Sequence, residues 1–239
     1  MECNFSEFQF THLITREIED KIIFSNLGLV MPRFPNQVEE AKGGYDVSLD
    51  GPIVSVYLQY KLSEKLTQRP AKEWDEFEEK EYFRIKIYPD NLSRQHNTLV
   101  ELAGKSRKNQ VFYCVPAFTE ISEMQDYYDK REVAIHSAFI RCYGLSKISG
   151  DDQHNICFTI EPKKTIMHSE PIEAKMDVGW ESVIDISYDK QYNNIREFMN
   201  EISKQYNIQL GKNEVSDDLL NISEFFASKG MHMMLLKAK

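Results

Sequence analysis

Three polar residues on two neighbouring segments have the types and spacing needed for metal-assisted hydrolysis. Asp46 lies in one segment of alternating polar and apolar residues, and Gln59 and Lys61 lie in the next. Gln59 and Lys61 are two residues apart, so on a strand they point to the same side. If the two strands pair about a wide turn centred near 52–53, a carboxylate, an amide oxygen and an ammonium reach one point.

This donor set predicts a site for Mg²⁺ or Mn²⁺. Magnesium prefers hard oxygen ligands and keeps several waters. We expect Asp46 to bind the ion directly, with the Gln59 side-chain oxygen and the Tyr60 backbone carbonyl as further ligands. Lys61 is expected to orient a water for attack on a phosphodiester and to offset the developing negative charge. The competing interpretation is an ordinary solvated hairpin face without chemistry.

The segments around these residues predict an α/β protein. A stripe of isoleucines (Ile14, Ile18, Ile22) predicts a helix over 11–27, with Thr11 as its N-cap and Gly28 after its end. A loop over 29–44 leads to two paired strands at 45–49 and 54–61, each with one polar face. The charged stretch 62–83 is expected to be exposed and anchored by Trp74 and Phe77.

The remaining elements complete the predicted core and extend it. We expect a short strand at 84–89, a helix at 93–107 capped by Asn91 or Ser93, and a fully buried central strand at 111–118. A further helix follows from Thr119 or Ser122, with strands at 134–145 and 154–162. These elements predict one α/β domain over 1–188, with its core at about 10–120, and a helical extension packed on that core over 189–239.

The motif and the element order together resemble the PD-(D/E)XK, or restriction-endonuclease-like, nuclease superfamily. That family has the core order helix, three strands, helix, strand, in a mixed sheet flanked by helices. It carries an acid on the second strand and (D/E/Q)xK on the third, here Asp46 in GGYDVSL and Gln59-Tyr60-Lys61 in VYLQYK. The resemblance also implies a glutamate on the first helix that takes part in metal binding. Glu17 fits that place, with Glu19 as the alternative.

The resemblance implies a metal-dependent endonuclease, acting on DNA rather than RNA, of the kind found in restriction or anti-phage systems. The alternative is a catalytically inert subunit with the same fold that serves as a binding or scaffolding module. Candidate nucleic-acid contacts are the polar and basic residues that flank the motif: Lys65, Arg69, Lys72, Arg94, His96 and Asn97.

The charge of the chain argues against indiscriminate binding of nucleic acid. The formal net charge is −9 over 239 residues, and only residues 61–110, with 11 basic and nine acidic side chains, are net positive. We therefore expect activity to depend on a partner protein or on self-assembly. Four scattered cysteines predict free thiols, and the chain shows neither a secretory leader nor a membrane span, which predicts a cytoplasmic protein.

Overall fold

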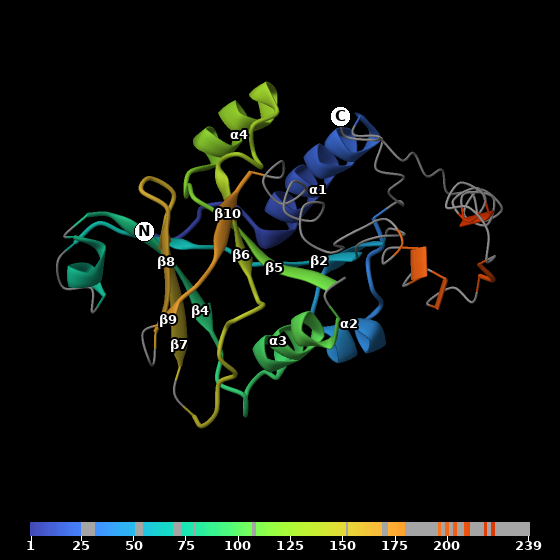
Figure 1. Cartoon of the computed structure of the whole chain (residues 1–239). Coiled ribbons are helices and arrows are strands. Elements are labelled where there is room, and N and C mark those ends of the chain that lie inside the picture. The colour runs from blue at the N-terminus through green and yellow to red at the C-terminus, as the bar shows by residue number, and fades with distance from the viewer. Residues whose placement is uncertain are drawn as a thin grey trace.

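The computed structural model describes residues 1–24, 32–50, 55–68, 73–78, 80–106, 109–151, 153–168 and 172–179, together with isolated positions between 196 and 222. Within these residues the chain is a mixed α/β fold with two five-stranded sheets and four α-helices (Figure 1). No helix among them is both long enough and apolar enough to cross a membrane.

The helices are α1 (Glu7–Phe24), α2 (Gln37–Gly43), α3 (Gln95–Lys105) and α4 (Ile121–Lys130), with one 3-10 helix, η1 (Trp74–Phe77). The strands are β1 (Val47–Asp50), β2 (Ser55–Tyr60), β3 (Glu64–Leu66), β4 (Tyr82–Ile87), β5 (Asn109–Pro116), β6 (Ser137–Arg141), β7 (His154–Thr159), β8 (Lys164–His168), β9 (Ile172–Glu173) and β10 (Met176–Val178).

The first sheet has the order β1-β2-β5-β6-β10. The β2–β5 pair is parallel, and the connection between these strands contains α3, while the other pairs are antiparallel. The predicted hairpin and the predicted central strand are both confirmed. β5 is buried from Val111 onward because it lies between β2 and β6 with both faces covered.

Helices and the second sheet cover the two faces of the first sheet (Figure 1). One face packs against α1 through Phe10, Ile14 and Ile18, which are fully buried at a spacing of four residues, and against α4. The other face packs against Leu99 and Ala103 of α3 and against the second sheet. The first sheet is therefore a central layer with a core on each side.

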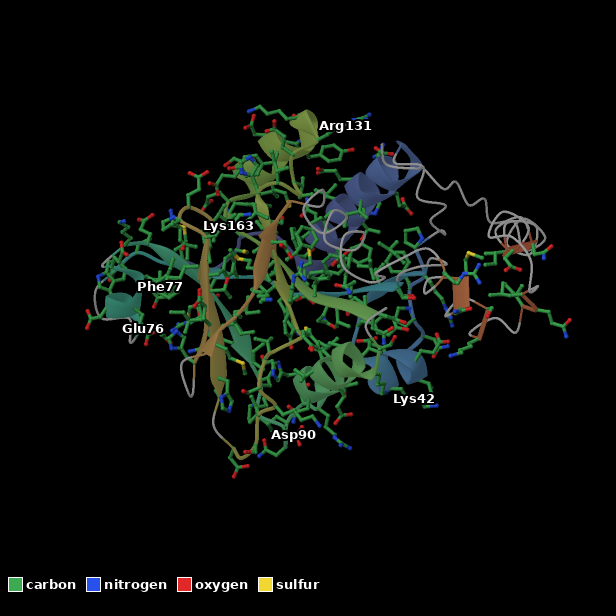
Figure 2. All side chains as sticks on the ribbon, in the orientation of Figure 1. Lys42, Glu76, Phe77, Asp90, Arg131 and Lys163 are labelled. Atoms are coloured by element: carbon green, nitrogen blue, oxygen red, sulfur yellow. The ribbon has the colours of Figure 1, made fainter. Side chains whose placement is uncertain are left out.

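The second sheet has the order β3-β4-β7-β8-β9 and is antiparallel throughout. Its outer face is covered by η1, whose Trp74 and Phe77 are buried, as the sequence predicted. Figure 2 shows Glu76 and Phe77 at this outer edge of the molecule. The predicted strands 134–145 and 154–162 belong to different sheets, since β6 joins the first and β7 the second.

Two local predictions are corrected. The first helix begins at Glu7 rather than near Thr11, because the Ser6 hydroxyl accepts the Gln9 amide proton and caps it there. The predicted loop at 29–44 contains α2, which Asn36 caps through a reciprocal bond with Glu39. Gly28, the turn at 51–54 and nearly all of 189–239 lie outside the described residues.

Candidate active site

The β1–β2 register brings the three motif residues to one end of the hairpin. Val47 pairs with Leu58, so Asp46 stands opposite Gln59, as predicted. Gln59 Nε2 donates to Asp46 Oδ2 at 2.7 Å and to the Tyr60 carbonyl oxygen at 3.1 Å. The Tyr60 amide also donates to Asp46 Oδ2, at 2.8 Å. One carboxylate oxygen and one carbonyl oxygen therefore converge on the Gln59 amide.

Helix α3 buries this polar cluster and fixes its orientation. Gln95, the first residue of α3, donates from Nε2 to Gln59 Oε1 at 2.9 Å. Gln59 is only 1% exposed, and Ser48 and Ser55 on the same face are buried as well. The interpretation of this face as solvent-exposed is thus wrong. β2 is an inner strand, and its polar face lies beneath α3. A buried amide needs all its partners, and Gln59 has them.

Asp46 is the carboxylate of the cluster, and its pKa is shifted toward the neutral form. Burial, with a smaller contribution from the nearby charge of Glu7, raises the pKa of Asp46 to about 6, from an ordinary value of 3.8. The Tyr60 amide, the Lys61 ammonium and the Gln59 side chain act in the opposite direction. A carboxylate that is held in place by donors and still costly to ionise is one that a cation would stabilise.

The chemistry of these donors fits a hard divalent cation. Asp46 Oδ2 and the Tyr60 carbonyl oxygen both lie within 3.1 Å of Gln59 Nε2. Rotating the Gln59 amide by a half-turn, with Gln95 turning its own amide to accept from Gln59 Nε2, would bring three oxygens together, an arrangement that a cation would stabilise. Carboxylate, amide and carbonyl oxygens are ligands that Mg²⁺ accepts. In the described part of the chain, no three His, Cys, Asp or Glu side chains converge on one point.

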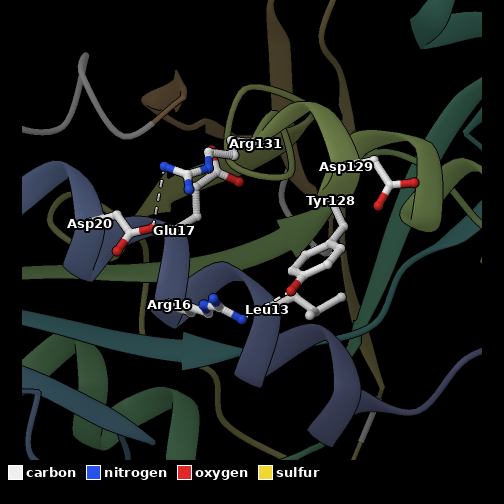
Figure 3. A pocket seen from close by; sticks show the side chains of 7 residues that line it. All are labelled: Leu13, Arg16, Glu17, Asp20, Tyr128, Asp129 and Arg131. Atoms are coloured by element: carbon white, nitrogen blue, oxygen red, sulfur yellow. Dashed lines mark hydrogen bonds and ion pairs between the residues drawn. The ribbon is translucent and has the colours of Figure 1, made fainter.

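Glu17, the predicted helix ligand, lies elsewhere. Its carboxylate accepts the Ala134 amide proton at 3.2 Å, and it lines a cavity of about 210 Å³ between α1 and α4. Figure 3 shows it beside Arg131 and Asp20, which form an ion pair at 3.8 Å. The acid of α1 that acts on Asp46 is Glu7, ten residues earlier.

The predicted nucleic-acid contacts differ in their exposure and in their partners. Arg94 is exposed beside α3, whereas the Lys65 ammonium pairs with Glu81 at 2.7 Å. His96 is 2% exposed and bonds the Tyr113 hydroxyl and the Ser146 carbonyl, so this side chain does not reach solvent.

Asn97 has an internal structural role as well. It donates at 2.8 Å to both Asp90 and the Ile148 carbonyl, and it accepts the Ile148 amide proton. Its side chain ties α3 to the segment before β7, and both of its amide protons are used in these bonds. Arg69 and Lys72 lie outside the described residues.

Two residues of the site, Glu7 and Gln95, were missed from the sequence. The signal for Glu7 was present, because Ser6-x-x-Gln9 has the pattern of a helix start and would have moved the first helix four residues earlier. No local signal marked Gln95, since its role depends on how α3 packs over β2.

Comparison of the chain with protein-family models, with curated proteins and with solved structures gives no match.

Proposed function

We propose that the protein is a Mg²⁺- or Mn²⁺-dependent nuclease of the restriction-endonuclease-like type, with Asp46, Gln59 and the Tyr60 carbonyl as its metal ligands. The observation that carries the proposal is the convergence of Asp46 Oδ2 and the Tyr60 carbonyl on the Gln59 side chain. Lys61 follows directly on β2 and is close enough for its charge to favour the ionised form of Asp46.

Each residue has a distinct role in this proposal. A bound divalent cation would supply Lewis-acid activation of the attacking water and charge neutralisation at the phosphate. Asp46 and Gln59 would hold that cation, with the Gln59 amide turned so that its oxygen faces Asp46. Gln95, which bonds Gln59 at 2.9 Å, would then turn its own amide and accept from Gln59 Nε2. The Lys61 ammonium would orient the attacking water and stabilise the negative charge that develops on the phosphate oxygens.

The element order supports the same fold type. Helix α1 precedes an isolated antiparallel bridge between Arg33 and Ser48, then β1 and β2, and later α3 and the parallel strand β5. This order resembles the helix, three strands, helix and strand of the nuclease core, with a single bridge in the place of the first strand and with α2 added between the bridge and β1. β3 and β4 are inserted between β2 and α3 and belong to the second sheet.

The test is cleavage of labelled duplex DNA, with RNA in a parallel assay, in Mg²⁺ or Mn²⁺ and in EDTA. We expect metal-dependent cleavage of DNA by the wild type and none by Asp46→Asn. Asp75→Asn, which changes an exposed carboxylate on η1, is the matched control and should cut normally. Cleavage that persists in Asp46→Asn would overturn the assignment.

A second candidate is the inert binding module. It is favoured by the internal satisfaction of the cluster, because Asp46 Oδ2 already accepts two hydrogen bonds and Gln59 is bonded on both sides. The two candidates differ in Mn²⁺ affinity: a nuclease binds the ion in an Asp46-dependent manner, and a module built on this cluster does not. Calorimetric titration of wild type and Asp46→Asn separates them.

A further inference from the structure

A polar groove of about 550 Å³ lies between α2 and the first turn of α3. Gln37, Glu40 and Ala41 line one wall, and Ser93, Arg94 and Gln95 line the other, with Gly44 at the end. The volume is in the range of pockets that hold small organic ligands, about 300–1,000 Å³. Figure 1 shows the two helices side by side below the first sheet.

The groove adjoins the candidate active site through two of its own residues. Gln95 bonds Gln59 at 2.9 Å, and Gly44 stands two residues before Asp46. The cavity between α1 and α4 lies apart from it, on the opposite face of the first sheet. A substrate strand with one phosphate at Asp46 therefore has this groove beside its neighbouring nucleotide.

Gly44 keeps the end of the groove in its present shape. Its backbone is left-handed, with φ of 71°, and its amide donates to the Glu40 carbonyl at the end of α2. A Cβ atom there would lie 3.1 Å from the Gln95 carbonyl oxygen. Glycine thus allows α2 to meet the first turn of α3 at the residue that holds Gln59.

The side chains of the walls are the kinds that recognise a nucleotide. Gln37 and Glu40 are exposed and one turn apart on α2, so they share a face. Glutamine pairs with adenine and glutamate accepts from the cytosine amino group. Arg94 is an exposed cation on the facing wall, suited to a phosphate. The groove therefore offers a backbone contact and two base contacts.

We propose that this groove binds the nucleotide next to the scissile phosphate, with Arg94 on its phosphate and Gln37 and Glu40 on its base. This inference rests on the proposed nuclease function. It makes the groove the part of the site that selects sequence, while the Asp46 cluster holds the reacting phosphate.

The test uses two readouts on the full chain. Binding of a fluorescently labelled, random-sequence single-stranded DNA is measured in EDTA at several salt concentrations. Arg94→Ala should bind about 10-fold more weakly at ~50 mM salt, with a salt slope lower by about 1, since one phosphate contact is lost. Arg16→Ala, an exposed arginine on α1, is the control and should stay within about twofold of wild type.

The second readout is the sequence preference at the cut, from sequencing the ends of a randomised DNA library cleaved in Mg²⁺. The Gln37→Ala/Glu40→Ala variant should lose about 10-fold preference at one position beside the cut and retain preference elsewhere. The groove assignment is overturned if the double variant keeps the wild-type sequence preference and Arg94→Ala binds DNA as tightly as Arg16→Ala does. If the protein still cleaves DNA in that case, the nuclease proposal stands without the groove. Arg94-dependent binding without any cleavage supports the groove as a nucleic-acid contact and overturns the nuclease proposal.

Discussion

Replacing Asp46 with asparagine should stabilise the metal-free protein at neutral pH. Both hydrogen bonds of the carboxylate end on the same atom, Oδ2, where the asparagine carbonyl oxygen can take over both. The substitution therefore removes the charge and keeps the contacts. Burial, the main cause, raises the pKa of Asp46 from 3.8 to about 6, and this separation corresponds to a cost of about 3 kcal/mol for ionising the group in the fold.

The sign of the pH dependence follows from the raised pKa. Below about pH 3 Asp46 is largely protonated in both folded and unfolded chains, so it contributes almost nothing to their difference. Between pH 4 and 6 the folded chain keeps a proton that the unfolded chain has released, and the free energy of unfolding falls as the pH rises. Above about pH 6.5 the full cost of about 3 kcal/mol is present in wild type and absent from Asp46→Asn.

Urea denaturation in EDTA between pH 4 and 8, followed by circular dichroism, measures this difference. We expect the stability advantage of Asp46→Asn to grow by about 2.5 kcal/mol from pH 4 to pH 7.5. Asp75→Asn, an exposed carboxylate, should show a difference that hardly changes with pH. A pH-independent difference for Asp46→Asn, or a variant less stable than wild type at pH 7.5, would refute the reasoning.

Four further predictions concern single side chains. Lys61→Ala should abolish cleavage in the DNA assay while urea denaturation shows a stability within ~0.5 kcal/mol of wild type, because the side chain is not fully buried. Glu7→Gln should weaken Mn²⁺ binding, measured by calorimetry, more than Glu17→Gln does, because the charge of Glu7 acts on Asp46. Glu17→Ala should lower the free energy of unfolding by about 1–3 kcal/mol, because it removes the acceptor of the Ala134 amide proton. His96→Ala should destabilise the fold by about 2–4 kcal/mol, because it removes the bonds to the Tyr113 hydroxyl and the Ser146 carbonyl. DNA affinity, measured by fluorescence anisotropy, should be unchanged. Weakened affinity in a folded His96→Ala protein would contradict the structural role.

The register of the hairpin was predictable because two local constraints agree. Alternation assigns Val47 and Leu58 to the core face, and a turn centred near 52–53 then fixes Asp46 opposite Gln59. A shift of the β1–β2 register by one residue would turn the apolar side chains of one strand away from the core. The identity of the cluster therefore followed from the sequence, since faces and register are local properties of two adjacent strands.

Burial of the same cluster was not predictable, because it depends on a distant segment. Gln59 and Ser48 stand on a face whose polarity predicts solvent, yet α3 packs over it and Gln95 arrives 36 residues later in the chain. The second sheet was not predictable for the same reason, because it also depends on distant segments: Arg84 of β4 pairs with Cys157 of β7. Pairings at such separation leave no periodic signal in either strand.

The position of the α1 acid shows how one boundary error moves a functional assignment. A helix expected to begin at Thr11 leaves Glu7 outside it and makes Glu17 the natural candidate. With the Ser6 cap, the helix starts four residues earlier, and at ~1.5 Å per residue Glu7 and Glu17 are ~15 Å apart along its axis. Only one of them can approach Asp46, and Glu7 is the one whose charge acts on it. A divalent cation bound at Asp46 would therefore also be attracted by the charge of Glu7, and its own charge would favour the ionised form of the buried Asp46.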